Sequence, residues 1–433
     1  MKISSFGLRS KYFHLKMPKL KTICLAVGLA LVPALSMAQA PTLLRGTVVD
    51  ARTRAALPYA SLGLRHTGIG TVSNAEGTFR LQVPAGHASD TVEVQCLGYA
   101  PLRLRLQPAL LAAAQTLALT PQEYQLNEVR VTAYTPTSLL AKAVRTTRAR
   151  MASPVVLNCY YREFARLNGR YNKFADGLVD YYIKANPRRP QAPEVQVRVR
   201  ESRVGELPTA PDDANKAIPS PIDVEKAGSY YDVTERARFL DSTSFRFYSY
   251  EVREAVSPNG AEDPFYVVTC TPITQEYPYL QQATVRIDRR SFTIRSVESE
   301  VPGALQQYMK GINLLIIKAK VNSSRKRIEY HELNGQVYPS FVRLDVGMEI
   351  TTGNKPPLQY VFSSGMLVRD VALGAQVAPF PKAERHSGSL YKKGTSYQHP
   401  YWLEGNVVPA TAEEEAVIKE LEKATASAAK PSR

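Results

Sequence analysis

The fold is decided by the stretch from Arg45 to Leu106, which reads RGTVVDARTRAALPYASLGLRHTGIGTVSNAEGTFRLQVPAGHASDTVEVQCLGYAPLRLRL. Apolar and polar residues alternate along several short segments, and a period of two residues is typical of half-buried strands. These segments are Gly46–Val49, Tyr59–Leu64, Thr78–Val83 and Asp90–Gly98. Polar turns separate them, at Asp50–Thr53 and at Asn74–Gly77, where Asn and Gly tolerate positive φ. The stretch therefore predicts paired antiparallel strands joined by tight turns.

The same stretch resembles the carboxypeptidase-regulatory-like domain, a transthyretin-like β-sandwich that is common in envelope proteins of the Bacteroidota. The residues that carry the resemblance are Gly46, Val48, Asp50, Pro58, Ala60, Thr71, Asn74, Gly77, Phe79, Gly98 and Tyr99. From their positions at strand entry and exit, Gly77 and Gly98 are expected to have conformations or close contacts that a side chain would disturb, and Phe79 between them is expected to be buried. The resemblance implies a Greek-key β-sandwich over residues 43–120. It implies no activity, because this module is the non-catalytic appendage of metallocarboxypeptidases.

The first 38 residues have the pattern of a secretory signal peptide. They contain six Lys or Arg and no acid, then an apolar run at Ile23–Val32 and the small-residue exit Ser36-Met37-Ala38. A membrane anchor is the alternative, but the run is short for a span and ends in a cleavable pattern. We therefore expect an exported protein, in the periplasm or associated with the outer membrane.

The whole chain of 433 residues carries 55 Lys and Arg against 39 Asp and Glu, so it stays basic without the leader. In an exported protein this charge would meet anionic lipid, lipopolysaccharide or acidic polysaccharide and not nucleic acid. Because the basic residues are scattered, a solubilising role is the alternative. Three cysteines follow the leader, Cys96, Cys159 and Cys270, and their spacing is no disulfide framework. We expect buried free thiols, with a Cys159–Cys270 bridge as the alternative.

Residues 121–152 are predicted to link the sandwich to the rest of the chain. Gln125–Ala133 reads as an alternating strand, and Thr135–Met151 as a helix with a basic side. Its apolar side holds Leu139, Leu140, Ala143, Val144, Thr147 and Met151. Such a helix could lie on a membrane surface, but the narrow stripe without large aromatic residues favours packing on a sheet.

Residues 153–405 predict a larger antiparallel β domain. Eleven alternating segments occur, namely Tyr160–Leu167, Arg170–Lys184, Val195–Arg203, Phe245–Arg253, Phe265–Thr271, Ala283–Asp288, Phe292–Glu300, Leu314–Val321, Arg327–Leu333, Tyr338–Ile350 and Leu358–Val371. Asn-Gly pairs at 168–169, 259–260 and 334–335 favour hairpin turns. Glu206–Ala227 is predicted as a surface loop, and Tyr391–Trp402 is expected to dock on the sheet.

The last segment, residues 406–433, is predicted as a helix and a tail. Thr411 and Glu414 form a capping box that opens a helix to about Thr425. The β-rich region is similar to an uncharacterised C-terminal domain found with the regulatory-like sandwich in many Bacteroidota proteins. The residues concerned are Tyr161-Arg162-Glu163, Asn168-Gly169, Val285–Asp288, Phe292-Thr293-Ile294 and Trp402. The strand pair around Asp288 is also similar to open half-barrels that carry lipids or lipoproteins.

Candidate catalytic and metal-binding patterns are weak. A zinc carboxypeptidase needs clustered His and Glu ligands, but His331 and Glu332 are strand neighbours that would point to opposite faces. Glu298 and Glu300 would share one face, as a paired-carboxylate glycosidase could use, although solvated strands show the same alternation. Tyrosine pairs at 160–161, 181–182 and 230–231 could stack on sugars, but tyrosine also favours strands. We therefore assign no catalytic, cofactor-binding or metal-binding residue and expect no cofactor.

The sequence as a whole predicts a mainly β, non-enzymatic exported envelope protein that binds or scaffolds at the outer membrane or in the periplasm. Its possible partners are an envelope glycan, a lipid or another outer-membrane protein, with peripheral membrane contact. The alternatives are a hydrolase of surface polymers and a periplasmic carrier of lipid or lipoprotein. The continuous apolar run Leu314–Ile317 should be covered on both faces, by the core and by either the helix Thr135–Met151 or an apolar ligand.

Overall fold

A computed structural model describes the structure of this protein. It describes residues 42–122, 134–186, 188, 193–207, 223–229, 231–234, 237–256, 262–275, 277, 280–309, 311–314, 317–352, 356–374, 377–398, 400 and 405–428. The predicted signal peptide, the linking strand Gln125–Ala133, the Asn259-Gly260 turn, Tyr230 and Trp402 lie outside these residues. So do Leu315 and Ile316, so the expectation for the apolar run Leu314–Ile317 stays a prediction.

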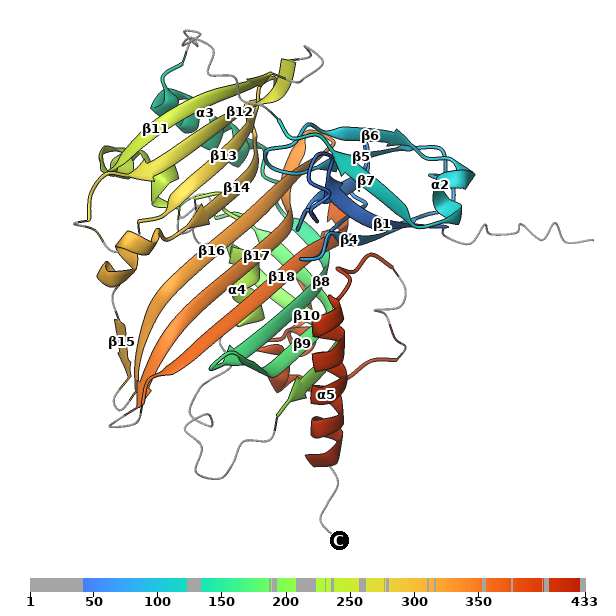
Figure 1. Ribbon diagram of the computed structural model, residues 1–433, viewed down its shortest axis with the longest axis vertical. Helices are drawn as coiled ribbons and strands as arrows, with labels where there is room; N and C mark the ends of the chain where they lie inside the picture. The colour runs from blue at the N-terminus through green and yellow to red at the C-terminus, as the bar shows by residue number, and fades with distance from the viewer. Residues whose placement is uncertain are drawn as a thin grey trace, which may run out of the picture. The chain divides into compact units, whose positions relative to one another are not determined.

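The N-terminal domain is the predicted β-sandwich (Figure 1). One sheet has the order β4-β1-β7 and the other has the order β3-β2-β5-β6. Their bounds are β1 Thr42–Asp50, β2 Ser61–Leu64, β3 Gly70–Val72, β4 Thr78–Val83, β5 Thr91–Gln95, β6 Leu102–Arg105 and β7 Gln115–Leu119, with the short helix α2 at Pro108–Ala112. The strands pair antiparallel except β1 with β7, which run parallel.

The turns and core of the sandwich are those that the sequence predicts. Asn74 Oδ1 accepts hydrogen bonds from the backbone N–H groups of Glu76 and Thr78, both at 2.9 Å, which closes the turn before β4. Gly77 has φ +74° and a Cβ there would lie 2.6 Å from the carbonyl oxygen of Val48. Gly98 has φ +83° but open space around it, so only its backbone conformation requires glycine. Phe79 is buried, as expected.

The larger domain is one open, mainly antiparallel sheet with the order β10-β9-β8-β18-β17-β16-β14-β13-β12-β11, and β15 pairs with β16 (Figure 1). Its strands are β8 Val155–Leu167, β9 Arg170–Lys184, β10 Glu194–Glu206, β11 Tyr248–Val256, β12 Glu262–Pro272, β13 Gln282–Asp288, β14 Ile294–Glu300, β15 Gly311–Leu314, β16 Ile317–Leu333, β17 Gln336–Thr352 and β18 Leu358–Leu373. Asn168-Gly169 and Asn334-Gly335 have positive φ at both residues, as hairpin turns between β8 and β9 and between β16 and β17 require.

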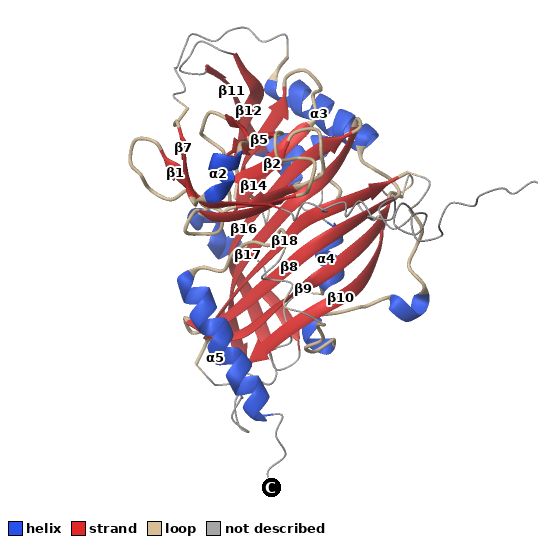
Figure 2. Cartoon of the chain, turned by 90° about the vertical axis from the view of Figure 1, so that its right-hand side faces the viewer, coloured by secondary structure: helices blue, strands red, loops and turns tan. Residues whose placement is uncertain are grey.

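One face of this sheet carries helices, and we call it the helical face. It packs against α3 (Pro136–Arg150) and α4 (Val224–Ser229), together with the 3-10 helices η2 (Arg238–Leu240), η3 (Ser242–Phe247), η4 (Gly303–Tyr308) and η6 (Leu390–Lys392). Figure 2 shows α3 and α4 against the strands. Helix α3 buries Leu139, Leu140, Ala143, Val144 and Thr147, which confirms packing on the sheet in place of a membrane-surface position.

The opposite face carries the sandwich and helix α5 (Ala412–Ala428), and we call it the sandwich face. Val72 of β3 packs with Phe341 and Leu367 of the sheet. Ile418 and Leu421 of α5 pack with Phe164 and Phe174 on the same face. The expected capping box is present, because Thr411 N–H donates to Glu414 Oε2 at 3.0 Å and Glu414 N–H donates to Thr411 Oγ1 at 3.1 Å.

Several predicted element boundaries are wrong. The structure has no separate strands at Leu314–Val321 and Arg327–Leu333. Leu314 ends β15, and the rest of both segments that the structure describes belongs to one continuous strand, β16, because the polar residues between them stay paired with β17. Ser242–Phe247 is 3-10 helical, so the strand predicted from Phe245 begins at Tyr248. Val224–Ala227, predicted as loop, starts helix α4, and the segment 109–119 holds the unpredicted strand β7.

The remaining expectations concern cysteines and docking. Cys96, Cys159 and Cys270 are buried free thiols, and the alternative of a Cys159–Cys270 bridge is wrong. The segment after residue 380 docks on the edge strand β10, because Ser396 and Ser202 exchange backbone hydrogen bonds of 2.7 and 2.8 Å. Among the described residues, no helix combines the length and the apolar character needed to cross a bilayer.

Candidate functional site

A hollow of about 580 Å³ lies between the sandwich and the sandwich face of the sheet. We call it the ion-pair groove. Strands β13, β14, β16 and β17 supply one wall, and the sandwich supplies Pro58 and Tyr59. The charged residues in its lining are Glu298, Glu300, Arg325, Lys326, Arg327, Arg343 and Asp345.

Strand register brings these charges together. Glu298 stands opposite Arg327, and Glu300 stands opposite Arg325 across β14 and β16. Arg327 in turn stands opposite Arg343 across β16 and β17. Directly opposed residues of neighbouring strands have Cβ atoms about 5 Å apart. Charges placed at every second position of three adjacent strands therefore form one ladder on one face.

The ladder runs from a buried floor to an exposed rim. Arg327, whose side chain is 13% exposed, pairs with Glu298 at 2.9 Å and with Glu329 at 2.8 Å. Arg343 contacts Asp345 at 2.8 Å, and Arg325, 72% exposed, contacts Glu300 at 2.7 Å. Burial raises the pKa of Glu329, while Arg327 and the neighbouring Arg286 oppose that shift. The buried floor, formed by Arg327 and Glu329, is therefore held in place, whereas Arg325 and Glu300 at the rim are exposed to solvent.

Tyr59 joins the sandwich to this ladder. Its φ of +55° is unusual for a tyrosine, and it lies directly after Pro58. The Tyr59 ring stacks on Phe341 with ring centroids 6.2 Å apart, and the Arg343 guanidinium lies 4.4 Å from the Tyr59 ring centroid. The Tyr59 ring and the Asp345 carboxylate thus position Arg343 in the groove, and planar guanidinium groups suit polar ligands with several acceptors.

The structure places the predicted site residues as follows. Glu298 and Glu300 share one face, as expected, but each forms an ion pair with an arginine, so the arrangement is an ion-pair ladder and not a free carboxylate pair. His331 Nε2 lies 3.0 Å from the carbonyl oxygen of Thr67, whereas Glu332 contacts Arg295 and Arg150. This confirms that His331 and Glu332 point to opposite faces. Within the part of the chain that the structure describes, no cluster of three or more His, Cys, Asp or Glu could hold a metal ion.

Two of the three tyrosine pairs lie in the core, and Tyr230 of the third pair is outside the described residues. Tyr160, Tyr161, Tyr181 and Tyr182 are buried, which confirms their role as strand formers. Sequence analysis did not identify five of the groove residues, namely Tyr59, Arg325, Arg327, Arg343 and Asp345. Their signal is the repeated charge at alternate positions of consecutive strands, which becomes visible only once the register is known.

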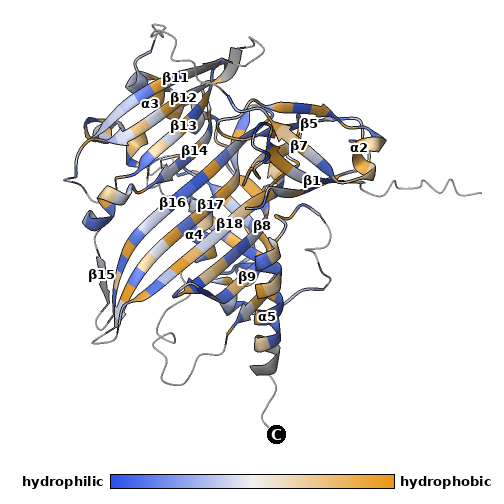
Figure 3. Ribbon diagram, in the orientation of Figure 1, coloured by the Kyte–Doolittle hydropathy of each residue, from blue (hydrophilic) through white to orange (hydrophobic). Residues whose placement is uncertain are grey.

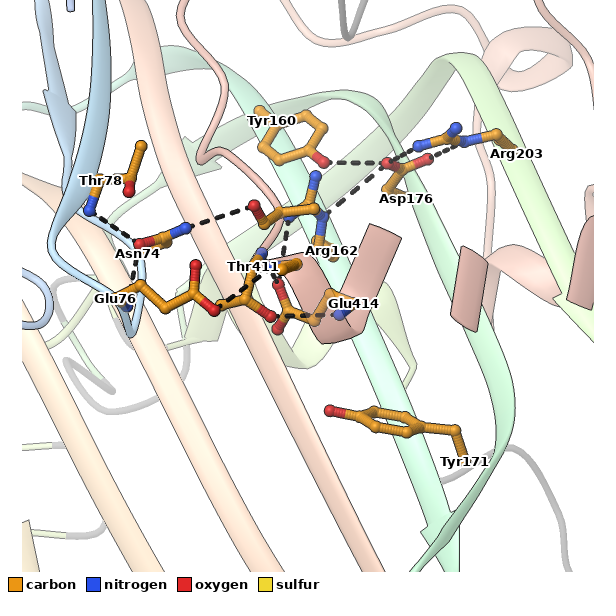
Figure 4. Close-up of polar contacts among 12 residues, drawn as sticks. Asn74, Glu76, Thr78, Tyr160, Arg162, Tyr171, Asp176, Arg203, Thr411 and Glu414 are labelled. Carbon is orange, nitrogen blue, oxygen red and sulfur yellow. Dashed lines mark hydrogen bonds and ion pairs between the residues drawn. The ribbon is translucent and has the colours of Figure 1, made fainter. Parts of the chain in front are cut away.

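A polar network outside the groove joins strands of the sheet to helix α5 (Figure 4). Asp176 accepts from Tyr160 at 2.9 Å and from two nitrogens of Arg203 at 2.7 and 3.1 Å. Arg162 lies 3.9 Å from Asp176 and 3.8 Å from Glu414 of α5. The network connects strands β8, β9 and β10 to α5, beside the sandwich turn that holds Asn74.

Comparisons with known proteins identify the N-terminal domain. Residues 44–131 match the family model described as the CarboxypepD_reg-like domain. No curated protein sequence matches the chain. Among solved structures, a LolA superfamily protein from Nitrosomonas europaea is 12% identical over 58% of this chain and 97% of its own, with a TM-score of 0.21. A structure of lipid–protein interactions in lipovitellin is 7% identical over 60% of this chain and 29% of its own, with a TM-score of 0.22. Likenesses this distant assign neither the fold nor the function.

Proposed function

We propose that this chain is a non-enzymatic, exported binding protein of the cell envelope, and that it holds a segment of a polar polymer such as a glycan in the ion-pair groove. The observation that carries this proposal is the convergence of the ladder and the Tyr59–Arg343 stack in one hollow between two domains. Concave sites with a few convergent polar groups are where ligands bind.

The chemistry of the groove favours a ligand with many hydroxyl or amide groups. Each arginine and carboxylate at the rim presents several donors or acceptors in a plane, and hydrogen bonds to charged groups contribute about 1.5–3 kcal/mol each. Because the lining pairs acids with arginines, a neutral or zwitterionic segment matches it better than a densely charged one. An apolar chain would leave these polar groups without partners.

The hydrolase alternative lacks support from this geometry. A glycosidase needs one carboxyl group as proton donor and a second as nucleophile or base. Glu298 and Glu300 are each engaged by an arginine, and they sit on one strand at one side of the groove. Binding without chemistry is therefore the function that we propose.

The test is binding to defined polysaccharides by calorimetry. Dextran, polygalacturonate and chitosan oligosaccharides serve as neutral, acidic and basic probes. We expect dextran, the neutral probe, to bind more tightly than the two charged probes, and Arg343→Gln and Arg325→Ala to weaken its binding about tenfold or more, since each removes a charged hydrogen-bond donor. Arg253→Ala removes an exposed arginine paired with Glu251 on β11 and is the matched control. Equal affinity in all variants, or no binding to any probe, would contradict the proposal.

A second candidate function, carriage of an apolar chain, is favoured by a patch on the helical face. Ala165, Ile350, Tyr360 and Phe362 are buried there, and around them lie half-buried apolar residues. These are Leu167, Ala319, Leu344, Val346, Met348 and Leu358. Met348→Glu should abolish uptake of a fluorescent fatty acid if this patch binds acyl chains. Val361→Glu, on an exposed residue of β18, is the control.

A further inference from the structure

A second hollow, of about 350 Å³, lies beside the edge strand β10. Its lining comes from Arg198, Val199 and Arg200 of β10 and from the segment 383–393, which runs through the 3-10 helices η5 (Lys382–Glu384) and η6. Its charged members are Arg198, Arg200, Glu384, Arg385 and Lys393. Four cations thus line the hollow against one carboxylate, with a second carboxylate, Asp180, beneath them.

The two carboxylates are already in use. Asp180 accepts hydrogen bonds from Asn158 at 2.7 Å and from Arg198 at 2.8 and 3.1 Å, and it forms an ion pair with Arg200 at 3.1 Å. Glu384 contacts the remaining terminal nitrogen of Arg198 at 2.8 Å. Arg198 therefore contacts the two acids through all three of its side-chain nitrogens, which fixes its position in the site.

Arg200 and Arg385 keep donors for another partner. Arg200 contacts Asp180 through Nε, and Arg385 donates through Nε to the carbonyl oxygen of Phe380 at 2.8 Å. Within the described residues, no acceptor is found for the terminal guanidinium nitrogens of either arginine. Both side chains, like Lys393, belong to exposed residues. Three cations with unused donors therefore converge on one hollow.

The backbone fixes this convergence. A register shift between Val199 and Glu201 leaves Arg200 without a Cα partner on β9, so it projects from the strand as a bulge residue. His386 donates its backbone N–H to the carbonyl oxygen of Val197 at 2.8 Å, and Phe380 N–H donates to Gln196 Oε1 at 2.9 Å. These bonds clamp the segment that carries Arg385 to the edge strand.

A further guanidinium group, that of Arg369, lies within electrostatic range of Arg200. Burial, followed by the neighbouring charge of Arg200, lowers the pKa of Arg369. The Nε atom of Arg369 is buried and has no hydrogen-bond partner among the residues that the structure describes. An anion in the hollow would offset the repulsion between these guanidinium groups.

We propose that this hollow is a binding site for a phosphate group, held by the terminal guanidinium nitrogens of Arg200 and Arg385 and by the Lys393 ammonium. Guanidinium groups bind phosphate oxygens through two parallel hydrogen bonds, and lysine adds a point charge. The site lies apart from the ion-pair groove and does not depend on the function proposed for that groove. The phosphate belongs either to a free anion or to a phosphorylated lipid headgroup.

The test compares inorganic phosphate with vesicles of phosphatidylcholine, alone or mixed with phosphatidylglycerol. The full chain combining Arg200→Ala with Arg385→Ala is compared with wild type and with a control that combines Arg103→Ala with Arg253→Ala. Both variants lose two exposed arginines, so their net charges are equal. We expect phosphate binding that weakens about tenfold or more in the first variant and is unchanged in the control.

The vesicles identify the source of the phosphate. Binding to the phosphatidylglycerol mixture that is lost in the first variant and displaced by free phosphate identifies a lipid headgroup. Phosphate binding without vesicle binding identifies a free anion. Equal losses in both variants would show that only net charge matters, and no binding to either probe would remove the site altogether. Both of those outcomes overturn the proposal.

Discussion

The side-chain amide of Asn74 donates a hydrogen bond of 3.3 Å to the backbone carbonyl oxygen of Ala410, just before helix α5 (Figure 4). The same sandwich turn reaches the helix itself, because Glu76 Oε1 accepts from the backbone N–H of Ala412 at 3.3 Å. The first N–H groups of a helix have no partner within it, and side-chain acceptors satisfy them. A turn of the N-terminal domain thus caps the C-terminal helix.

Asn74→Ala should therefore weaken both the turn and the cap. It removes the donor to Ala410 and the acceptor for Glu76 N–H and Thr78 N–H. We expect the free energy of unfolding to fall by about 2 kcal/mol, since a buried N–H left without a partner costs about 1–3 kcal/mol. Urea denaturation measures this loss. A change below about 0.5 kcal/mol would show that water replaces the Asn74 amide without cost.

The Asp176–Arg203 pair should have a larger effect. The Asp176 side chain is fully buried and that of Arg203 is 7% exposed. Asp176→Asn leaves the buried Arg203 guanidinium with the partly exposed Glu422 carboxylate, 3.4 Å away, and breaking a buried pair costs about 3–5 kcal/mol. Glu300→Gln, in the exposed Arg325 pair, should cost less than about 1 kcal/mol. Similar losses for both changes, measured by urea denaturation, would contradict the assignment of Asp176 to the core.

Local patterns could be read from the sequence wherever the signal is confined to a few residues. Strand β9 has the predicted bounds Arg170–Lys184 because its alternation starts directly after an Asn-Gly turn. Helix α3 begins after its cap Thr135, which accepts from Ser138 N–H at 3.2 Å. Elements that depend on pairing with a distant segment could not be predicted. Strand β7 is an example, because it pairs parallel with β1, about 70 residues earlier in the chain.

The candidate groove depends on two facts that no local pattern contains. One is the register that aligns Arg327 with Glu298 and with Arg343 across three strands. The other is the docking of the sandwich through Val72 and Tyr59 onto Phe341. Glu298 and Glu300 could be placed on one face from sequence spacing alone. Their arginine partners lie on another strand and could not be assigned.

The core of the sandwich gives a third prediction. Phe79 is 1% exposed and contributes to the cluster that joins both sheets. Phe79→Ala should lower the free energy of unfolding by about 3–5 kcal/mol, because it removes apolar burial and leaves a cavity. Thr116→Ala, at an exposed position of β7, should stay within about 0.5 kcal/mol of wild type. A loss below about 1 kcal/mol for Phe79→Ala in thermal or urea unfolding would place Phe79 outside the packed core.

Substitutions at Gly77 and Gly98 allow the cost of backbone strain to be compared with the cost of steric overlap. Gly77 and Gly98 both have positive φ, and alanine is strained there by about 1 kcal/mol. Only at Gly77 would the added Cβ also collide with backbone, 2.6 Å from the Val48 oxygen. Gly77→Ala should therefore destabilise clearly more than Gly98→Ala, as measured by the midpoint of thermal unfolding. Equal shifts of the unfolding midpoint would mean that the backbone of the turn before β4 moves to accommodate the added Cβ.

The last prediction concerns Glu163, which lies buried on the helical face. Its Oε2 accepts from the Tyr161 hydroxyl at 2.6 Å, and its Oε1 is buried without a partner among the described residues. Burial raises the pKa of Glu163 from 4.5 to about 7, although the Tyr161 hydrogen bond acts in the opposite direction. In the folded protein the carboxyl therefore stays protonated at pH values where the unfolded chain has released its proton.

Between about pH 4.5 and pH 7 the folded state binds more protons than the unfolded state at this position. The free energy of unfolding should then fall as the pH rises through this window and level off above it, by about 3 kcal/mol in total. Glu163→Gln keeps an acceptor for Tyr161 and carries no charge, so it should be more stable than wild type at pH 8 by a similar amount. Near pH 4 the two proteins should have the same free energy of unfolding.

Urea denaturation across this pH range measures the difference, and Glu415→Gln, at an exposed position of α5, is the matched control. A constant difference between wild type and Glu163→Gln at all pH values would show that Glu163 does not titrate in this window.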